Sequence, residues 1–205
     1  TIKTAADLKA DIRQAAAKRL EERVVGELRD LSMPSVRFEV RLLSREGKNA
    51  LSASGADEVS FVMSANAGEA LGPISRIASG GELSRIMLAL KNVFAEKDGV
   101  DALIFDEIDT GVSGVAAQRV AEKLASLGRT KQVLCVTHLP QIAAMAQQQY
   151  LVEKAEHGGR TYTNIRLLDR EGRRYELARL SGGDMITDIQ LAGAEELLAR
   201  GASGA

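Results

Sequence analysis

Three short stretches of this sequence carry polar residues of the kinds that act on phosphates. They are Ser79-Gly80-Gly81-Glu82, the pair Asp106-Glu107 after a short apolar run, and His138 after a second apolar run. Backbone N–H groups at the start of a helix bind anions, carboxylates bind Mg²⁺ or orient water, and an imidazole exchanges hydrogen bonds with phosphate or water. Together these residue types suggest nucleotide chemistry.

The Ser-Gly-Gly stretch stands at the start of a segment with helical spacing of its apolar residues. Glycines in the first turn of a helix leave backbone N–H groups accessible, and the helix dipole adds positive charge there. Ser79 occupies the N-cap position, so its hydroxyl could cap the helix or donate to a phosphate oxygen. Because Glu82 follows three residues later, an ordinary capping box explains the same residues without a ligand. Both interpretations stay open at this point.

The two adjacent acids follow a run typical of a buried strand. Such a strand delivers its C-terminal carboxylates to the edge of a parallel sheet where ligands bind. Asp106 would hold Mg²⁺, directly or through water, and Glu107 would turn toward a water placed for in-line attack on a γ-phosphate. The plain alternative is a strand that ends in two solvated acids.

His138 also follows an apolar run, so we expect it at the same edge of the sheet. Its imidazole could donate to a γ-phosphate or hold the attacking water, although a lone histidine is more often structural. His157, in a Gly-containing turn, is expected at the surface. Cys135 is the one cysteine, which excludes an intrachain disulfide and a two-cysteine metal site. We expect it to be a small buried hydrophobic residue.

The segments that must position these residues predict an α/β fold built mainly on a parallel sheet flanked by helices. Residues 101–105 and 131–137 read as strands buried on both faces, and residues 81–96, 112–127 and 139–148 read as helices. Strand and helix alternate along the chain, which is typical of parallel sheets. The predicted apolar face of the first of these helices consists of Leu83, Ile86, Met87, Leu90 and Phe94.

The chain opens with a long predicted helix at residues 4–32. Its apolar stripe changes phase between Ala15 and Ala17 and its other side is charged, which suits a coiled coil or a packed surface helix. We therefore divide the chain into a coiled-coil base helix at 1–34 and a larger lobe at 35–205.

Antiparallel strand pairs are predicted before and after the parallel strands along the chain. Residues 36–42 and 59–63 alternate apolar with polar positions, as half-buried paired strands do. Residues 150–155 and 161–167 read as a hairpin that turns at His157-Gly158-Gly159. The tail at 172–201 reads as helix with a break at Ser181-Gly182-Gly183.

The composition limits the partners. The 205 residues carry a net charge of −1, so the chain has no overall electrostatic attraction for DNA or anionic membranes. Only 3% of the side chains are aromatic, so few are available to stack on nucleic-acid bases. No signal peptide or membrane span is recognisable in the sequence, so a cytoplasmic protein without a membrane partner is expected.

A local group of arginines is the best candidate for DNA contact. Neighbouring Asp169, Glu171 and Glu176 reduce its charge to about +3, and a solvated charged face explains it better. The arginines are Arg160, Arg166, Arg170, Arg173, Arg174 and Arg179.

In this order along the chain, the three polar stretches resemble the motifs of the ATP-binding-cassette ATPases. Ser79-Gly80-Gly81-Glu82 matches the signature motif, Leu103-Ile104-Phe105-Asp106-Glu107 the Walker B strand with its catalytic glutamate, Asp109 the D-loop and His138 the switch histidine. Transporter cassettes usually continue after the glutamate with Pro-Thr or Pro-Ser. The run "DEIDTGVSG" is more similar to the SMC-like ATPases of chromosomes and DNA repair.

The resemblance implies an ATP hydrolase that uses ATP and Mg²⁺. In the family, Ser79, Gly80 and Gly81 would face the γ-phosphate bound by a second head of a homodimer, and Asp109 would lie at the same interface. The phosphate-binding loop Gly-x-x-x-x-Gly-Lys-Ser/Thr does not occur in this sequence. In SMC-like proteins that loop lies in the N-terminal half of the polypeptide.

The resemblance therefore implies the C-terminal lobe of a split ATPase head, with the long first helix at the base of a coiled-coil arm. Its partners would be an N-terminal lobe of the same protein, a second head, and DNA through the full-length protein. Alone, the lobe would hydrolyse almost no ATP. The implied role is recombinational repair of double-strand breaks, in the cytoplasm and at the nucleoid.

Two other functions stay open from the sequence. A transporter's nucleotide-binding subunit would use the same motifs, although it does not account for residues 4–32 or for "DEIDTG". A tether of DNA ends, in which ATP turnover is secondary, would use the same residues throughout.

Overall fold

The structure, a computed structural model, describes residues 5–45, 57–76, 79–95, 97–157, 160–183 and 185–204. Contacts between residues separate the chain into two compact units, Thr1–Asp98 and Gly99–Ala205. Each unit combines helices with β-strands, which confirms the predicted α/β class. The predicted boundary at residue 34 concerns the coiled coil of a whole protein, and it stays a prediction.

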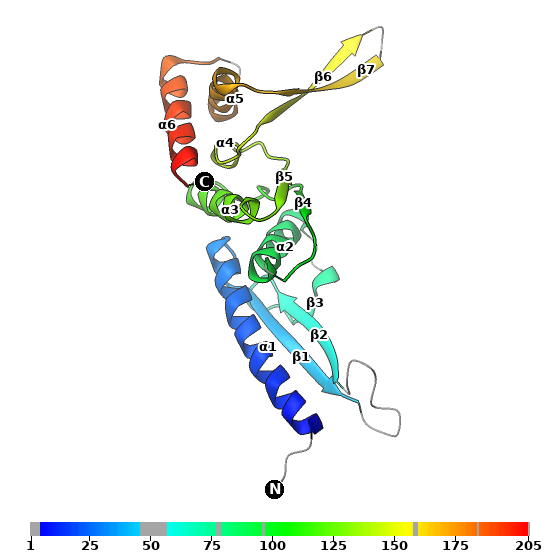
Figure 1. The fold of residues 1–205 in the computed structure, drawn as a ribbon. Helices are drawn as coiled ribbons and strands as arrows, with labels where there is room; N and C mark the ends of the chain where they lie inside the picture. Colours follow the sequence, from blue (N-terminus) through cyan, green and yellow to red (C-terminus); the bar gives the residue numbers. More distant parts are fainter. Residues whose placement is uncertain are drawn as a thin grey trace. The chain divides into compact units, whose positions relative to one another are not determined.

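The first unit consists of a long helix beside an antiparallel sheet (Figure 1). Its elements are α1 (Ala5–Asp30), β1 (Arg37–Ser44), β2 (Asp57–Ser64), β3 (Gly72–Pro73), the 3₁₀ turn η1 (Ile74–Arg76) and α2 (Gly80–Phe94). Strands β1 and β2 pair antiparallel along their whole length, as predicted. The rings of Phe38 and Phe61 stack across this pair with their centroids 5.7 Å apart.

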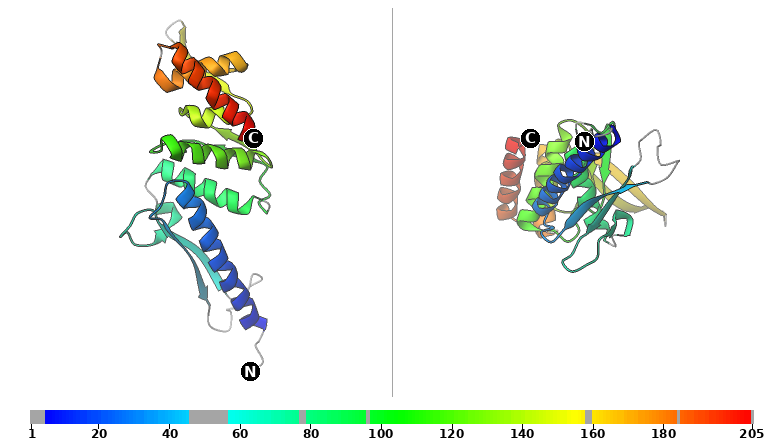
Figure 2. Two further views of the ribbon diagram at one scale, coloured as in Figure 1. Left: turned by 90° about the vertical axis from the view of Figure 1, so that its left-hand side faces the viewer. Right: turned by 90° about the horizontal axis from the view of Figure 1, so that it is seen from below.

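Helix α1 uses its apolar stripe unequally along its length. In the C-terminal half, Val24 and Leu28 are fully buried where the helix contacts β1 and α2 (Figure 2). Before the predicted change of phase, Ile12 is 60% exposed. The neighbouring Arg13 is tied to the sheet by an ion pair with Asp57. The change of phase thus separates a packed half from a half that turns an apolar side chain to solvent.

Helix α2 forms as predicted, but its predicted apolar face is only partly correct. Ile86 is fully buried, whereas other members of that face are partly exposed, namely Leu83, Met87 and Phe94. Leu88 and Ala89 are fully buried instead. The helix carries apolar residues on more than one side, so its packing, which includes α1, decides which of them point inward.

The second unit combines a parallel strand pair, a hairpin and four helices. Its elements are β4 (Ala102–Phe105), α3 (Gly114–Gly128), β5 (Gln132–Cys135), α4 (Pro140–Ala144), β6 (Tyr150–His157), β7 (Arg160–Leu167), α5 (Arg170–Gly182) and α6 (Asp188–Gly204). Strands β4 and β5 are parallel, and β6 and β7 form the predicted hairpin. Helix α4 is shorter than the predicted 139–148. Gly158, Gly159 and the side chain of His157 lie outside the described parts of the chain.

Small side chains let helices α4, α5 and α6 approach closely. Their shared core includes Ala144, Leu177 and Ala194. A Cβ atom added to Gly201 would lie 2.4 Å from the carbonyl oxygen of Ala144, so this position of α6 requires glycine. Among the described residues, no helix is long and apolar enough to cross a membrane.

The β4–β5 pair is covered on one side only, so the prediction that both strands are buried on both faces is wrong for this chain. Leu103 and Phe105 of β4 are buried. On the opposite side Ile104 is 76% exposed, and its neighbours Leu134 and Val136 are 49% and 63% exposed. Side chains alternate between the two sides of a strand, so these residues lie opposite Leu103 and Phe105, on the side that solvent reaches.

Candidate functional site

The parallel pairing of β4 and β5 brings two of the three predicted stretches to one edge. Phe105 pairs with Cys135 at the last position of both strands, and the N–H of Val136 donates to the carbonyl of Phe105 over 2.9 Å. The chain therefore leaves both strands side by side, toward Asp106 on one and His138 on the other. The prediction that these two stretches share an edge is confirmed.

A buried carboxylate, Asp109, joins the two loops at this edge. Its side chain is 4% exposed, and its Oδ2 accepts from the Thr137 hydroxyl over 2.6 Å and from the His138 backbone N–H over 2.9 Å. The His138 Nδ1 lies 2.9 Å from the same oxygen. Thr137 Oγ1 in turn accepts from the Leu139 N–H over 3.1 Å. The loop after β5 is thus held by the loop after β4.

This contact was only partly foreseeable. The resemblance singled out Asp109 for an interface with a second head, and it singled out His138 for the nucleotide. Thr137 was not assigned a role, although its polar side chain between an apolar strand and a histidine was the available signal. The predicted position of Asp109 at a head–head interface stays a prediction, and in this structure its carboxylate points into its own chain.

The His138 ring is held at one nitrogen and open at the other. Its side chain is 72% exposed, while Nδ1 faces the buried carboxylate of Asp109. Because the two ring nitrogens lie on opposite sides of the imidazole, Nε2 is the nitrogen available to a ligand. The histidine is therefore attached to the fold without being buried in it.

Asp106 and Glu107 are both exposed at the end of β4. The Oδ1 atom of Asp106 accepts from the Glu107 N–H over 2.9 Å. Glu107 adopts φ 57°, in the left-handed region that L-residues rarely occupy, and the next residue, Ile108, is fully buried. The buried isoleucine anchors a turn that holds the glutamate outward in a strained conformation.

The described residues suit Mg²⁺ held by the single carboxylate of Asp106, directly or through water, as predicted. No group of three or more His, Cys, Asp or Glu side chains among the described residues could hold a metal ion by itself. Magnesium keeps several waters and binds one or two protein carboxylates together with substrate phosphates. An exposed single carboxylate at the strand end suits that mode of binding.

Cys135, expected to be a small buried hydrophobic residue, is partly buried. Burial, together with the negative charges of Asp109 and Asp106, raises the pKa of its thiol to about 12. The thiol therefore stays protonated at neutral pH and is a poor nucleophile or metal ligand. Its surroundings also show that both carboxylates lie close to the end of β5.

The Ser-Gly-Gly stretch lies in the first unit, at the start of α2. Ser79 is the N-cap, and its Oγ accepts from the Glu82 N–H over 3.4 Å. Gly80 is exposed and Gly81 is buried. The capping interpretation is thus realised, and the anion-binding interpretation stays a prediction. That this stretch meets the ends of β4 and β5 at a shared nucleotide also stays a prediction.

Five of the six arginines considered for DNA contact are engaged within the fold. Arg166, Arg170, Arg174 and Arg179 form ion pairs with neighbouring glutamates. Arg173 donates to three main-chain carbonyls around the end of α4. These contacts favour a solvated structural face over a nucleic-acid site.

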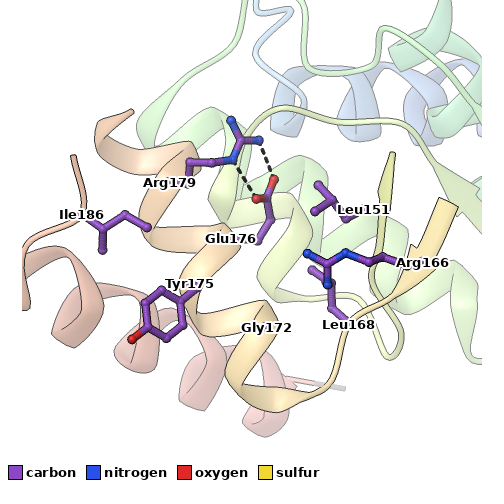
Figure 3. A pocket seen from close by; sticks show the side chains of 8 residues that line it. All are labelled: Leu151, Arg166, Leu168, Gly172, Tyr175, Glu176, Arg179 and Ile186. Atoms are coloured by element: carbon purple, nitrogen blue, oxygen red, sulfur yellow. Dashed lines mark hydrogen bonds and ion pairs between the residues drawn. The ribbon is translucent and has the colours of Figure 1, made fainter. Parts of the chain in front are cut away.

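A pocket of about 130 Å³ lies beside α5 and the strands of the hairpin (Figure 3). Apolar side chains such as Leu168 and Tyr175 line it together with the paired Glu176 and Arg179. None of the predicted site residues lines it. It is therefore no candidate for the nucleotide.

Comparison with known proteins identifies relatives over nearly the whole chain. The chain is 45% identical over 189 residues to the DNA repair protein RecN of Halalkalibacterium halodurans, and 46% identical over 193 residues to that of Treponema pallidum. These alignments cover 92% and 93% of this chain but 34% of each relative, so the chain spans about a third of their length. No protein-family model matches the sequence.

Among solved structures, the chain is similar to the Smc head domain with a coiled coil and joint from Pyrococcus yayanosii. The TM-score is 0.55 at 18% identity, over 85% of this chain and 31% of that one. At this identity the likeness concerns the fold alone. It confirms the predicted fold of an SMC-type head lobe.

The strained backbone at Glu107 leads to a first prediction. Replacing Glu107 with Gly removes the free-energy cost of a positive φ in an L-residue. This gain offsets the larger loss of backbone entropy that glycine undergoes on folding. We expect Glu107→Gly to keep or raise the free energy of unfolding, by up to about 1 kcal/mol, as measured by urea denaturation.

The matched control is Thr110→Gly in the same turn, where φ is not positive. This substitution should lower the free energy of unfolding by about 0.5–1 kcal/mol. Equal losses in both variants would show that the glutamate is not strained.

Proposed function

We propose that this chain is the C-terminal lobe of an SMC-like ATPase head. Nearly all of the chain matches about one third of the length of the RecN DNA repair proteins. The complete protein hydrolyses ATP between two such heads in recombinational repair of DNA double-strand breaks. The observation that carries the proposal is the edge of the β4–β5 pair. There, Asp106, Glu107 and His138 gather beside one another on a fold similar to an Smc head.

The residues of this edge divide the work of hydrolysis. Glu107, held outward by its turn, orients a water for in-line attack on the γ-phosphate. Asp106 holds Mg²⁺, which neutralises charge on the phosphates when it is bound. His138 offers Nε2 to the water or to a phosphate oxygen. Each role needs a fixed geometry more than a special reactivity, and the rigid strand ends supply it.

Ser79 and the two glycines serve the ATP of a second head. The hydroxyl of Ser79 caps α2 through an oxygen lone pair, so its proton stays available to a phosphate oxygen. The start of α2 adds the positive end of a 15-residue helix. Both contributions favour pairing of the heads while the γ-phosphate is present, and they lose their partner after hydrolysis.

The uncovered side of the β4–β5 pair is the contact surface for the N-terminal lobe. Parallel strands are stable when both faces are covered, and here Ile104, Leu134 and Val136 remain exposed. The relatives contain about two thirds of their length outside the matched region. A segment of that remainder supplies the missing layer, the phosphate-binding loop and its lysine. The isolated lobe therefore hydrolyses almost no ATP.

The other functions considered have less support. The relatives described above are DNA repair proteins, not transporter subunits. A DNA-end tether with secondary turnover differs from the proposal in its response to DNA. In the head assembled from both lobes, linear duplex DNA should stimulate ATP turnover if hydrolysis serves repair. Turnover that does not respond to DNA would instead favour the tether or the transporter subunit.

Glu107 provides the direct test of hydrolysis. In the full-length protein, Glu107→Gln should slow ATP turnover at least about 100-fold, because the amide cannot orient and deprotonate water as the carboxylate does. ATP-dependent pairing of heads, measured by light scattering, should persist. Near-normal turnover would contradict the assigned role, and a head that never hydrolyses ATP under any condition would contradict the proposed function as a whole.

Ser79 tests the contribution to a second head. Ser79→Arg places a long cation where a phosphate oxygen should approach, so ATP-dependent pairing should be lost. Binding of ATP to a single complete head, measured by fluorescent-nucleotide titration, should stay within about threefold of normal, since that head's own phosphate loop is intact. Equal loss of pairing and of binding would argue against a role across the interface. Ser79→Thr, which keeps the hydroxyl, is the control.

Ile104 tests the surface for the N-terminal lobe. Burying an isoleucine side chain contributes about 1.5–3 kcal/mol, so Ile104→Asn should weaken association of the two lobes about 10- to 100-fold by calorimetry. The control is Val115→Asn on α3, where the side chain is 79% exposed on a different element. If both variants bind the N-terminal lobe as tightly as the unmodified chain, the lobe docks elsewhere.

A further inference from the structure

We propose that Asp109 is a positioning residue for His138 of its own lobe, which fixes the imidazole so that Nε2 faces the nucleotide. This inference rests on the proposed function, because it assigns a task within the same site. It differs from the role that the resemblance implies for Asp109, which is contact with a second head.

The geometry around the carboxylate supports a role within the chain. A carboxylate that is 4% exposed needs donors from the protein, and one oxygen of Asp109 receives them from Thr137 and His138. Two of these contacts hold the His138 residue, one at its backbone and one at its ring. The ring and the loop that carries it are therefore positioned together by a single group.

The contact also selects the protonation pattern of the ring. A carboxylate accepts hydrogen bonds and cannot donate them, so we infer from the 2.9 Å separation that the tautomer with the proton on Nδ1 is the favoured one. In the neutral ring, Nε2 is then a hydrogen-bond acceptor, which suits a water close to the γ-phosphate. Asp109 thus determines what His138 offers to a ligand without touching that ligand.

Thr137 keeps the carboxylate in place for this task. Its hydroxyl donates to Asp109 over 2.6 Å and accepts from the Leu139 N–H over 3.1 Å. The hydroxyl thereby fixes the position of Asp109 relative to the loop after β5. The Oδ2 atom of the buried carboxylate is thus engaged inside its own lobe.

A double-mutant cycle on ATP turnover by the full-length protein tests the proposal. Asp109→Asn should lower kcat about 10- to 1,000-fold with KM for ATP unchanged, because the amide admits the other tautomer of His138. His138→Ala should lower kcat by at least as much. If Asp109 acts through His138, the double variant should be no slower than His138→Ala alone. Multiplying losses would overturn the proposal.

Pairing of heads separates the two possible roles of Asp109. Asp109→Asn should leave ATP-dependent pairing unchanged, as in the unmodified protein. Loss of pairing with an unaltered His138 ring would instead support contact with the second head. Thr137→Ser, which keeps the hydroxyl, should retain most of the turnover, whereas Thr137→Val should lower kcat in the same direction as Asp109→Asn.

Imidazole NMR tests the contact without relying on turnover. The sequence holds two histidines, so a His157→Gln variant assigns the resonances of His138. Above the usual range of imidazole titration, long-range ¹H–¹⁵N correlations of this chain should show the proton on Nδ1 and none on Nε2. Asp109→Asn should raise the population with the proton on Nε2.

These measurements distinguish failure of the inference from failure of the proposed function. An unmodified chain with the proton on Nε2 would overturn the positioning role even if ATP turnover is normal. If the complete protein fails to hydrolyse ATP while the Nδ1 proton is present and depends on Asp109, the contact stands and the proposed function falls.

Discussion

The buried carboxylate of Asp109 is the interaction on which the candidate site depends. A negative charge that is nearly removed from water must be compensated by donors, and here they come from Thr137 and His138 in the loop after the neighbouring strand. The two loops at the strand ends are therefore not independent. Burial, together with the same negative charge, raises the pKa of the Cys135 thiol, so the one cysteine of the sequence stays protonated at neutral pH. One group thus organises the polar side of this edge.

The apolar side of the same strands is incomplete in this chain. Ile104, Leu134 and Val136 form a row at matching positions of a parallel pair, yet water reaches all of them. Parallel strands of this composition occur where both faces are covered. The site residues stand directly beyond the ends of these strands, so a layer that covers the apolar row also stiffens the edge. In the proposed head, the lobe that completes the sheet therefore also completes the proposed nucleotide site.

Much of the fold and of the edge could be predicted from the sequence, because short apolar runs fix where a strand ends and which polar residues follow it. Asp106, Glu107 and His138 were placed by that reasoning alone. The contact between Asp109 and His138 could not be, since it joins residues 29 apart in the chain through a loop geometry that no local pattern encodes. The left-handed conformation of Glu107, beside the fully buried Ile108, belongs to the same loop and is likewise not encoded by a local pattern.

The buried face of α2 escaped prediction for a different reason: the helix is apolar on more than one side, and tertiary packing chose among them. Its first residue shows the opposite situation, in which two interpretations that looked exclusive are compatible. The cap uses a lone pair of Ser79 Oγ to accept from the Glu82 N–H, whereas a phosphate oxygen would take the hydroxyl proton. A capping serine is therefore already oriented with its proton away from its own helix. The local stability of α2 and its capacity to bind an anion draw on the same residue without competing for the same atom.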